Sequence, residues 1–139
     1  QELSKKGAKV ILLSHFGRPG GKREEKDSLK PVAKKLEQLL GGGVLFAEDC
    51  IGDEAKKAAR KMVGGDVAVF ENTRFHKGEE ANDPEFVRAL AENGDVYIND
   101  AFSAAHRAHA STEGLAHLLP SAAGRAMEKE LDYLSAALA

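Results

Sequence analysis

Arginine and histidine side chains gather in three segments of the sequence, each placed directly after a short apolar run. The first segment contains His15 and Arg18, the second contains Arg74, and the third contains Arg107. A guanidinium group can bind a phosphate or a carboxylate through two parallel hydrogen bonds. One surface arginine would usually be solvated, but three in equivalent places can converge. With His15 beside them, they predict a binding site for a small, multiply charged anion.

Other reactive side chains form weaker patterns. His106 and His109 are spaced i, i+3 and could share a helix face as metal ligands, but no third ligand lies at a standard spacing. We therefore predict no metal site. Cys50 follows two acidic residues, which disfavour a thiolate, so we expect a structural role for it rather than a nucleophilic one.

The carboxylates of Glu71 and Asp100 also follow apolar runs. Either could serve as a general base, but we favour a role in orienting an arginine or capping a helix. Neither G-x-x-x-x-G-K-[ST] nor a G-x-G-x-x-G after a strand occurs. The glycines at 41–43 come before an apolar run and indicate the end of a helix. We therefore predict no nucleotide site within the chain, and we assign no catalytic residue in it.

The composition excludes several classes of protein. The 139 residues are 42% hydrophobic and 30% charged, with a net charge of −2. This is too hydrophobic for a disordered tail, and no apolar run approaches the roughly 20 residues of a membrane span. The charge balance disfavours a general nucleic-acid binder, and the basic loop at residues 15–30 is mixed with acidic residues and lacks aromatic platforms. The single cysteine, Cys50, fits a reducing compartment.

Four apolar runs must position the candidate residues. They are rich in Val, Ile, Leu and Phe and do not alternate with polar residues, which is typical of strands covered on both faces of a parallel sheet. The runs are residues 10–13, 44–46, 67–70 and 96–98.

Segments with helical periodicity separate these runs. We expect helices at residues 29–40, 53–63 and 83–91, and a terminal helix that opens near Ser121. Alternating strands and helices predict an α/β fold, with a doubly wound, Rossmann-like, mainly parallel sheet in three α/β/α layers. In such a sheet ligands bind beyond the carboxyl ends of the strands, where the arginines lie.

The first residues suggest that the sequence is part of a longer one. Residues 1–7 are typical of the last turn of a helix, with Gly7 at its carboxyl end and no helix start before it. We expect residues 1–139 to form one domain, because no linker or repeat divides them.

Several of these segments together resemble the signature segments of phosphoglycerate kinase. Their order and spacing agree over essentially the whole chain, which makes the resemblance highly specific. The segments are residues 13–19, 49–52, 71–76, 78–80, 99–102 and 105–112.

The resemblance implies a cytoplasmic, monomeric glycolytic enzyme of two doubly wound domains. That enzyme moves a phosphoryl group between 1,3-bisphosphoglycerate and ADP to give 3-phosphoglycerate and Mg-ATP. Residues 1–139 would be the amino-terminal domain, which binds phosphoglycerate, without the family's first strand. The carboxy-terminal domain, which binds Mg-ATP or Mg-ADP, would lie outside the chain, and no cofactor would bind here.

The same resemblance assigns the substrate-binding residues by motif. They are His15, Phe16, Gly17, Arg18, Arg74 and Arg107. Ser103 stands where the family usually has glycine, and it fits only if its φ is negative. Phe16 stands where leucine is usual. Without the nucleotide domain the chain should not turn over alone. The alternative, from another class, is a non-catalytic module that binds small anions.

Overall fold

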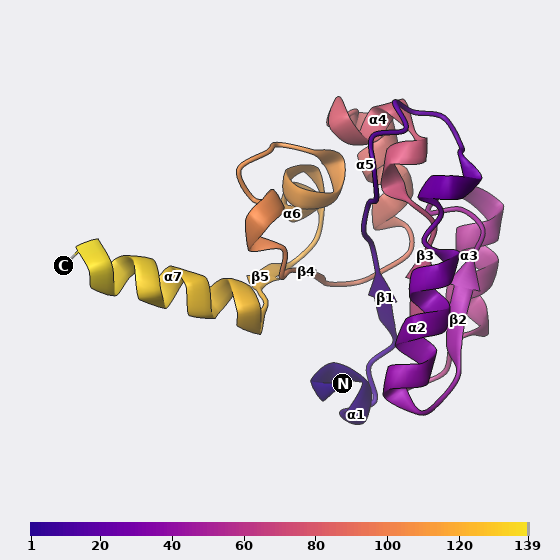
Figure 1. Cartoon of the computed structure of the whole chain (residues 1–139), viewed down its shortest axis with the longest axis horizontal. Coiled ribbons are helices and arrows are strands. Elements are labelled where there is room, and N and C mark those ends of the chain that lie inside the picture. Colours follow the sequence, from indigo (N-terminus) through magenta and orange to yellow (C-terminus); the bar gives the residue numbers. More distant parts are fainter. Residues whose placement is uncertain (139) are drawn as a thin grey trace.

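The structure, a computed structural model, describes residues 1–138. Helices and strands alternate along most of the chain (Figure 1). The strands are β1 (Val10–Leu12), β2 (Val44–Ala47), β3 (Val67–Phe70), β4 (Tyr97–Asn99) and β5 (Ser121–Ala123). The helices are α1 (Glu2–Lys5), α2 (Lys30–Leu40), α3 (Gly52–Lys61), α4 (Lys77–Glu80), α5 (Pro84–Ala91), α6 (Leu115–Leu118) and α7 (Arg125–Leu138), with short turns η1 (Glu25–Asp27), η2 (Thr73–Phe75), η3 (Phe102–Ala104) and the π-helical η4 (Ala110–Gly114).

Three parallel strands form the main sheet in the order β1-β3-β2. Val67 of β3 lies opposite Val10 of β1 on one side and opposite Val44 of β2 on the other. The chain runs from β1 through α2 to β2, and α3 then brings it back to β3 in the middle. The carboxyl ends of these strands therefore share one edge of the sheet.

Side chains of β3 point alternately into two hydrophobic layers. Val69 packs with Leu29 and Ala33 on the α2 side. Ala68 and Phe70 pack on the opposite side, into the layer formed with α3 and α5. Helices therefore cover both faces of the sheet, and the predicted three-layer α/β fold is confirmed.

The predicted helix ends agree closely with the structure where cap signals were present. Gly41, with φ of 69°, ends α2 in the left-handed region. The Asp83 carboxylate caps α5 by accepting hydrogen bonds from the amides of Glu85 and Phe86. The short α1 is followed by Gly7, with φ of 86°, as the opening residues indicated.

The last third of the chain differs from the expected single sheet. β4 pairs in parallel with β5, a strand that the sequence pattern did not predict, and these two strands form a separate sheet. The prediction that the terminal helix opens near Ser121 was wrong, because residues Ser121–Ala123 are extended against β4 and α7 begins at Arg125. Small residues of low strand propensity form β5 through backbone pairing, which periodicity cannot detect.

Helix α7 projects away from the rest of the chain (Figure 1). Of its apolar stripe, Met127 is buried, whereas Leu131 and Leu134 are 48% and 47% exposed. The periodicity predicted the helix correctly, but it did not show how much of the stripe the chain itself covers.

Candidate functional site

Hydrogen bonds join the loop after β1 to the turn η2 that follows β3. The amide of Thr73 donates to the carbonyl oxygen of Ser14 at 3.1 Å. The Asn72 side chain donates to the carbonyl oxygens of Phe16 and Asp27 at 2.8 and 2.9 Å. Two strand exits predicted to carry the anion site are therefore fixed against each other.

The loop after β1 also holds the side chain of Arg74. Its side chain is 8% exposed, and one Nη donates to the carbonyl oxygen of Gly17 at 3.1 Å. Its Nε lies 3.5 Å from a carboxylate oxygen of Glu80 but has no hydrogen-bond partner in the described chain. A buried, partly unpaired guanidinium is costly unless another acceptor binds it.

Gly17 occupies a position that only glycine fits. Its φ is +66°, and a Cβ there would lie 2.5 Å from Oδ1 of Asp27. The backbone can therefore turn its carbonyl group toward Arg74. This gives Gly17 a structural role in positioning that arginine.

His15, Arg74, Arg107 and His109 form a basic cluster. Burial lowers the pKa of His15, and the positive charges of Arg74 and Arg107 lower it further, against the opposing effect of Glu80. Burial and the same two arginines also lower the pKa of His109. The two arginines, from two different strand exits, therefore act electrostatically on both histidines.

His109 is the member of this cluster that we did not predict. We considered it only as a metal ligand with His106, and no group of three metal-ligating side chains within residues 1–138 includes either histidine. Its place two residues after Arg107, in the same strand exit, was the signal that could have identified it.

The remaining predicted residues are more exposed. Arg107 is exposed, its Nε lies 3.2 Å from Nε2 of His106, and its carbonyl oxygen accepts a hydrogen bond from Thr112. Phe16 is 55% exposed and meets η2 through its backbone. Arg18 is exposed, and no ion pair in the described part of the chain involves it. The structure thus leaves Arg18 outside the contacts that fix Arg74.

A buried polar network fixes the segment that follows Arg107. Glu79 of α4 is 1% exposed and accepts hydrogen bonds from the amide and hydroxyl of Ser111 at 3.2 and 2.5 Å. The Tyr97 hydroxyl donates to the carbonyl oxygen of Ser111 at 2.7 Å. Burial raises the pKa of Glu79 and raises the pKa of Tyr97 to about 12. This network links β4 and η4 to α4.

The two carboxylates considered as general bases act as helix caps. Glu71 is buried and accepts hydrogen bonds from the Leu29 amide at 2.8 Å and the Ser28 hydroxyl at 2.6 Å, at the start of α2. Asp100 accepts from the amides of Ala126 and Met127 at 2.8 and 3.1 Å, at the start of α7. Of the two roles that the sequence favoured, orienting an arginine or capping a helix, capping is observed for both, and Glu71 also lies 3.5 Å from Nη2 of Arg23.

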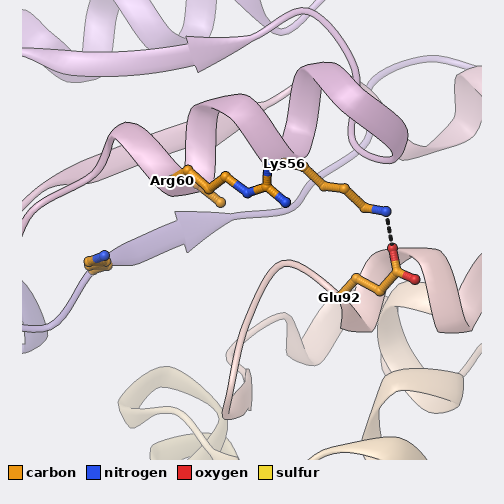
Figure 2. A pocket seen from close by; sticks show the side chains of 5 residues that line it. Lys56, Arg60 and Glu92 are labelled. Atoms are coloured by element: carbon orange, nitrogen blue, oxygen red, sulfur yellow. Dashed lines mark ion pairs between the residues drawn. The ribbon is translucent and has the colours of Figure 1, made fainter.

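A second charged region lies at the opposite end of the sheet. A shallow hollow of about 330 Å³ is lined by Lys9, which precedes β1, and by side chains of α3 and the end of α5. Figure 2 shows the Lys56 ammonium reaching the Glu92 carboxylate, at 2.6 Å, with Arg60 beside it. Both side chains are partly exposed, so this pair contributes little to stability.

The described residues include no helix that is both long and apolar enough to cross a membrane.

The whole chain matches a known family of proteins. The family model for phosphoglycerate kinase matches residues 1–139. The chain is 67% identical to phosphoglycerate kinase of Brucella suis over 137 residues, which are 99% of this chain and 35% of that protein. It is 61% identical to that of Rhodospirillum centenum over 139 residues, 100% of this chain and 35% of the relative. The chain therefore spans about a third of the length of these relatives.

Solved structures agree with the sequence matches. The fold matches phosphoglycerate kinase from Coxiella burnetii with a TM-score of 0.85 and 36% identity, over 97% of this chain and 33% of that one. It matches the enzyme from Pyrococcus horikoshii with a TM-score of 0.84 and 32% identity, over 96% and 34% of the two chains. Sequence, fold and order of motifs agree, and the chain belongs to the phosphoglycerate kinase family.

Proposed function

We propose that this chain is the phosphoglycerate-binding part of a cytoplasmic phosphoglycerate kinase of glycolysis. The observation that carries the proposal is Arg74, whose buried guanidinium is fixed by Gly17 and keeps an Nε without a hydrogen-bond acceptor. 3-Phosphoglycerate carries a phosphate and a carboxylate, both of which suit guanidinium groups. Family membership supports the choice of this anion over others.

Each predicted substrate-binding residue has a role in this proposal. Arg74 and Arg107 bind and neutralise the phosphoglycerate, and Arg18 reaches it from the exposed loop. His15 and His109, whose pKa values are lowered, stay largely neutral and act as hydrogen-bond partners. The Gly17 carbonyl holds the Arg74 side chain, and the Phe16 carbonyl holds the side chain of Asn72, which precedes η2.

In the direction that consumes ATP, a carboxylate oxygen of 3-phosphoglycerate attacks the γ-phosphorus and the bond to ADP breaks. Phosphoryl transfer depends on positioning and on stabilising the charge of the transferring group, and Mg²⁺ bound with the nucleotide would supply part of that charge stabilisation. The basic cluster supplies the positioning of the acceptor. No phosphate-binding glycine motif occurs in this sequence, so we assign Mg-ATP and Mg-ADP to the part of the enzyme that the longer relatives contain.

We propose accordingly that residues 1–139 bind phosphoglycerate but do not turn over alone. Titration of the 139-residue chain with 3-phosphoglycerate, followed by NMR, tests binding. Saturable shifts are expected at His15, Arg74, Arg107 and His109. Arg60→Gln, in the hollow at the other end of the sheet, is the matched control and should leave the titration unchanged.

Two results would count against this proposal. Absence of saturable shifts at the basic cluster would remove the binding site. Equal affinity for inorganic phosphate and 3-phosphoglycerate would instead favour the alternative, a non-catalytic module for small anions.

A further inference from the structure

Three different ligand-type side chains meet outside the basic cluster. Asp49 and Cys50 lie between β2 and α3, and His76 lies between η2 and α4. One carboxylate oxygen, the Cys50 Sγ and a ring nitrogen of His76 all lie within 4.8 Å of one another. His76 Nε2 is 2.7 Å from Oδ1 of Asp49. Spacing along the sequence did not predict this group, because the histidine belongs to a different strand exit.

The three donor atoms favour one class of metal ion over others. Sulfur, nitrogen and carboxylate oxygen are the ligands of Zn²⁺, with bonds of about 2.0–2.3 Å, so that neighbouring ligand atoms lie roughly 3–4 Å apart. The three donors lie within 4.8 Å of one another, so small side-chain rotations would bring them to that spacing. A hard cation such as Mg²⁺ would not use the thiolate.

Neighbouring groups orient the three ligands. The amides of Cys50 and Ile51 donate to Oδ1 of Asp49 at 2.6 and 3.3 Å. The His76 ring packs against Phe86, with ring centroids 5.2 Å apart. The side chain of Asn93 donates to the carbonyl oxygen of Cys50 at 3.3 Å. Supporting contacts of this kind fix ligand orientation in metal sites.

The group is accessible from one side. Cys50 is 0% exposed, whereas the side chains of His76 and Asp49 are 29% and 40% exposed. His76 and Ile51 line a shallow hollow of about 450 Å³, which also contains the acidic Asp83 and Glu85 and the basic Lys77. A cation can therefore approach from solvent, and water can occupy a fourth position.

We propose that Asp49, Cys50 and His76 form a binding site for a thiophilic divalent metal ion of the Zn²⁺ class. The ion binds the carboxylate, the ring nitrogen and the thiolate, and the thiol proton is released to solvent. The hydrogen bond between His76 and Asp49 is replaced by bonds from both to the metal. The site is separate from phosphoglycerate binding and does not depend on it.

Cobalt titration of the 139-residue chain tests the proposal directly. Co²⁺ in a tetrahedral site with a thiolate gives visible bands and a near-ultraviolet sulfur-to-cobalt charge-transfer band, and Zn²⁺ should abolish both. Cys50→Ser should remove the charge-transfer band. His76→Gln and Asp49→Asn, both at partly exposed positions, should weaken Co²⁺ binding about tenfold or more, because loss of even an outer-shell partner of a metal ligand typically costs about 10–100-fold in affinity.

The matched control is His117→Gln. His117 also pairs with a carboxylate, Glu113, but no thiol lies beside that pair. This variant should bind Co²⁺ as the parent does, and circular dichroism checks that each variant is folded. A parent spectrum without a charge-transfer band would overturn the proposal, and so would unchanged Co²⁺ affinity in folded His76→Gln and Asp49→Asn.

Discussion

Two regions of the molecule differ in how they are held together. The central region, formed by β1, β2, β3, α2, α3 and α5, has β3 buried on both faces. The terminal region, formed by β4, β5 and α7, has an exposed β5 and a helix with Met127 as its buried residue. Apolar burial stabilises the first region, whereas hydrogen bonds that the Asp100 carboxylate accepts and one that the Tyr97 hydroxyl donates fix much of the second.

The basic cluster contains residues from both regions. Arg74 comes from the central region and is buried, whereas Arg107 belongs to the segment after β4 and is exposed. Arg74 is therefore fixed by the chain itself, whereas the exposed Arg107 would be fixed only by a ligand if it binds one, as we propose. The following predictions run from the largest expected effect to the smallest.

Truncation of a core side chain should have the largest effect. Phe70 is 0% exposed in the middle of the central region, so Phe70→Ala should lower the free energy of unfolding by about 3–5 kcal/mol. Leu134→Ala on α7 is the control and should change it by about 0.5 kcal/mol or less. Urea denaturation measures both. Similar losses for the two variants would show that α7 is as well packed as β3.

The two arginines should respond differently to truncation. In the full-length enzyme, Arg107→Ala should lower kcat/KM for 3-phosphoglycerate about tenfold or more, or about 1.4 kcal/mol, with stability almost unchanged. Arg74→Ala should lower both kcat/KM and stability, because it also breaks the bond to Gly17. Steady-state kinetics and denaturation separate these effects. Unchanged kinetics in Arg107→Ala would remove its assignment as a substrate-binding residue.

Loss of the Asp100 cap should affect only the terminal region. Asp100→Ala leaves the amides of Ala126 and Met127 without their acceptor and should destabilise the start of α7 by about 1 kcal/mol. Hydrogen exchange should accelerate at these two amides and stay unchanged in β3. The matched control is Asp132→Ala, which removes an exposed carboxylate from α7 itself. Faster exchange throughout β3 would show that the regions unfold together.

The buried Glu79 should give the chain a pH dependence. Because burial raises its pKa above 4.5, the folded state binds its proton more tightly than the unfolded state. The stability that the protonated Glu79 contributes is fully present below pH 4.5, and it is lost as pH rises through the folded-state pKa. Glu79→Gln should flatten this decline in thermal-unfolding scans.

Glu113→Gln is the control for that measurement. The His117 partner lowers the pKa of Glu113 below 4.5. The stability that the ionised Glu113 contributes is therefore present above pH 4.5 and is lost as pH falls through its folded-state pKa. An unchanged pH profile in Glu79→Gln would assign the decline to another group.

Local signals predicted much of the central region. The apolar runs of β1, β2 and β3 and the caps of α2 and α5 are features of neighbouring residues, so they are legible in the sequence. β5 has no such signal, because Ser121–Ala123 is a strand only through its pairing with β4. The same contrast holds in the candidate site. Residue type and position after an apolar run predicted Arg74 and Arg107 as members of the site, but they did not lead us to predict His109.

The sequence by itself determined the α/β fold class, the order of strands and helices from β1 to β4 in outline, and the strand exits that carry arginine and histidine. Periodicity, glycine and cap residues act over a few positions, which is why they sufficed. Only the tertiary structure decided that Arg74 is buried against Gly17, that Glu71 and Asp100 cap helices, and that His76 meets Asp49 and Cys50. These contacts join residues far apart in the chain, and their distances follow from how the sheet and helices pack.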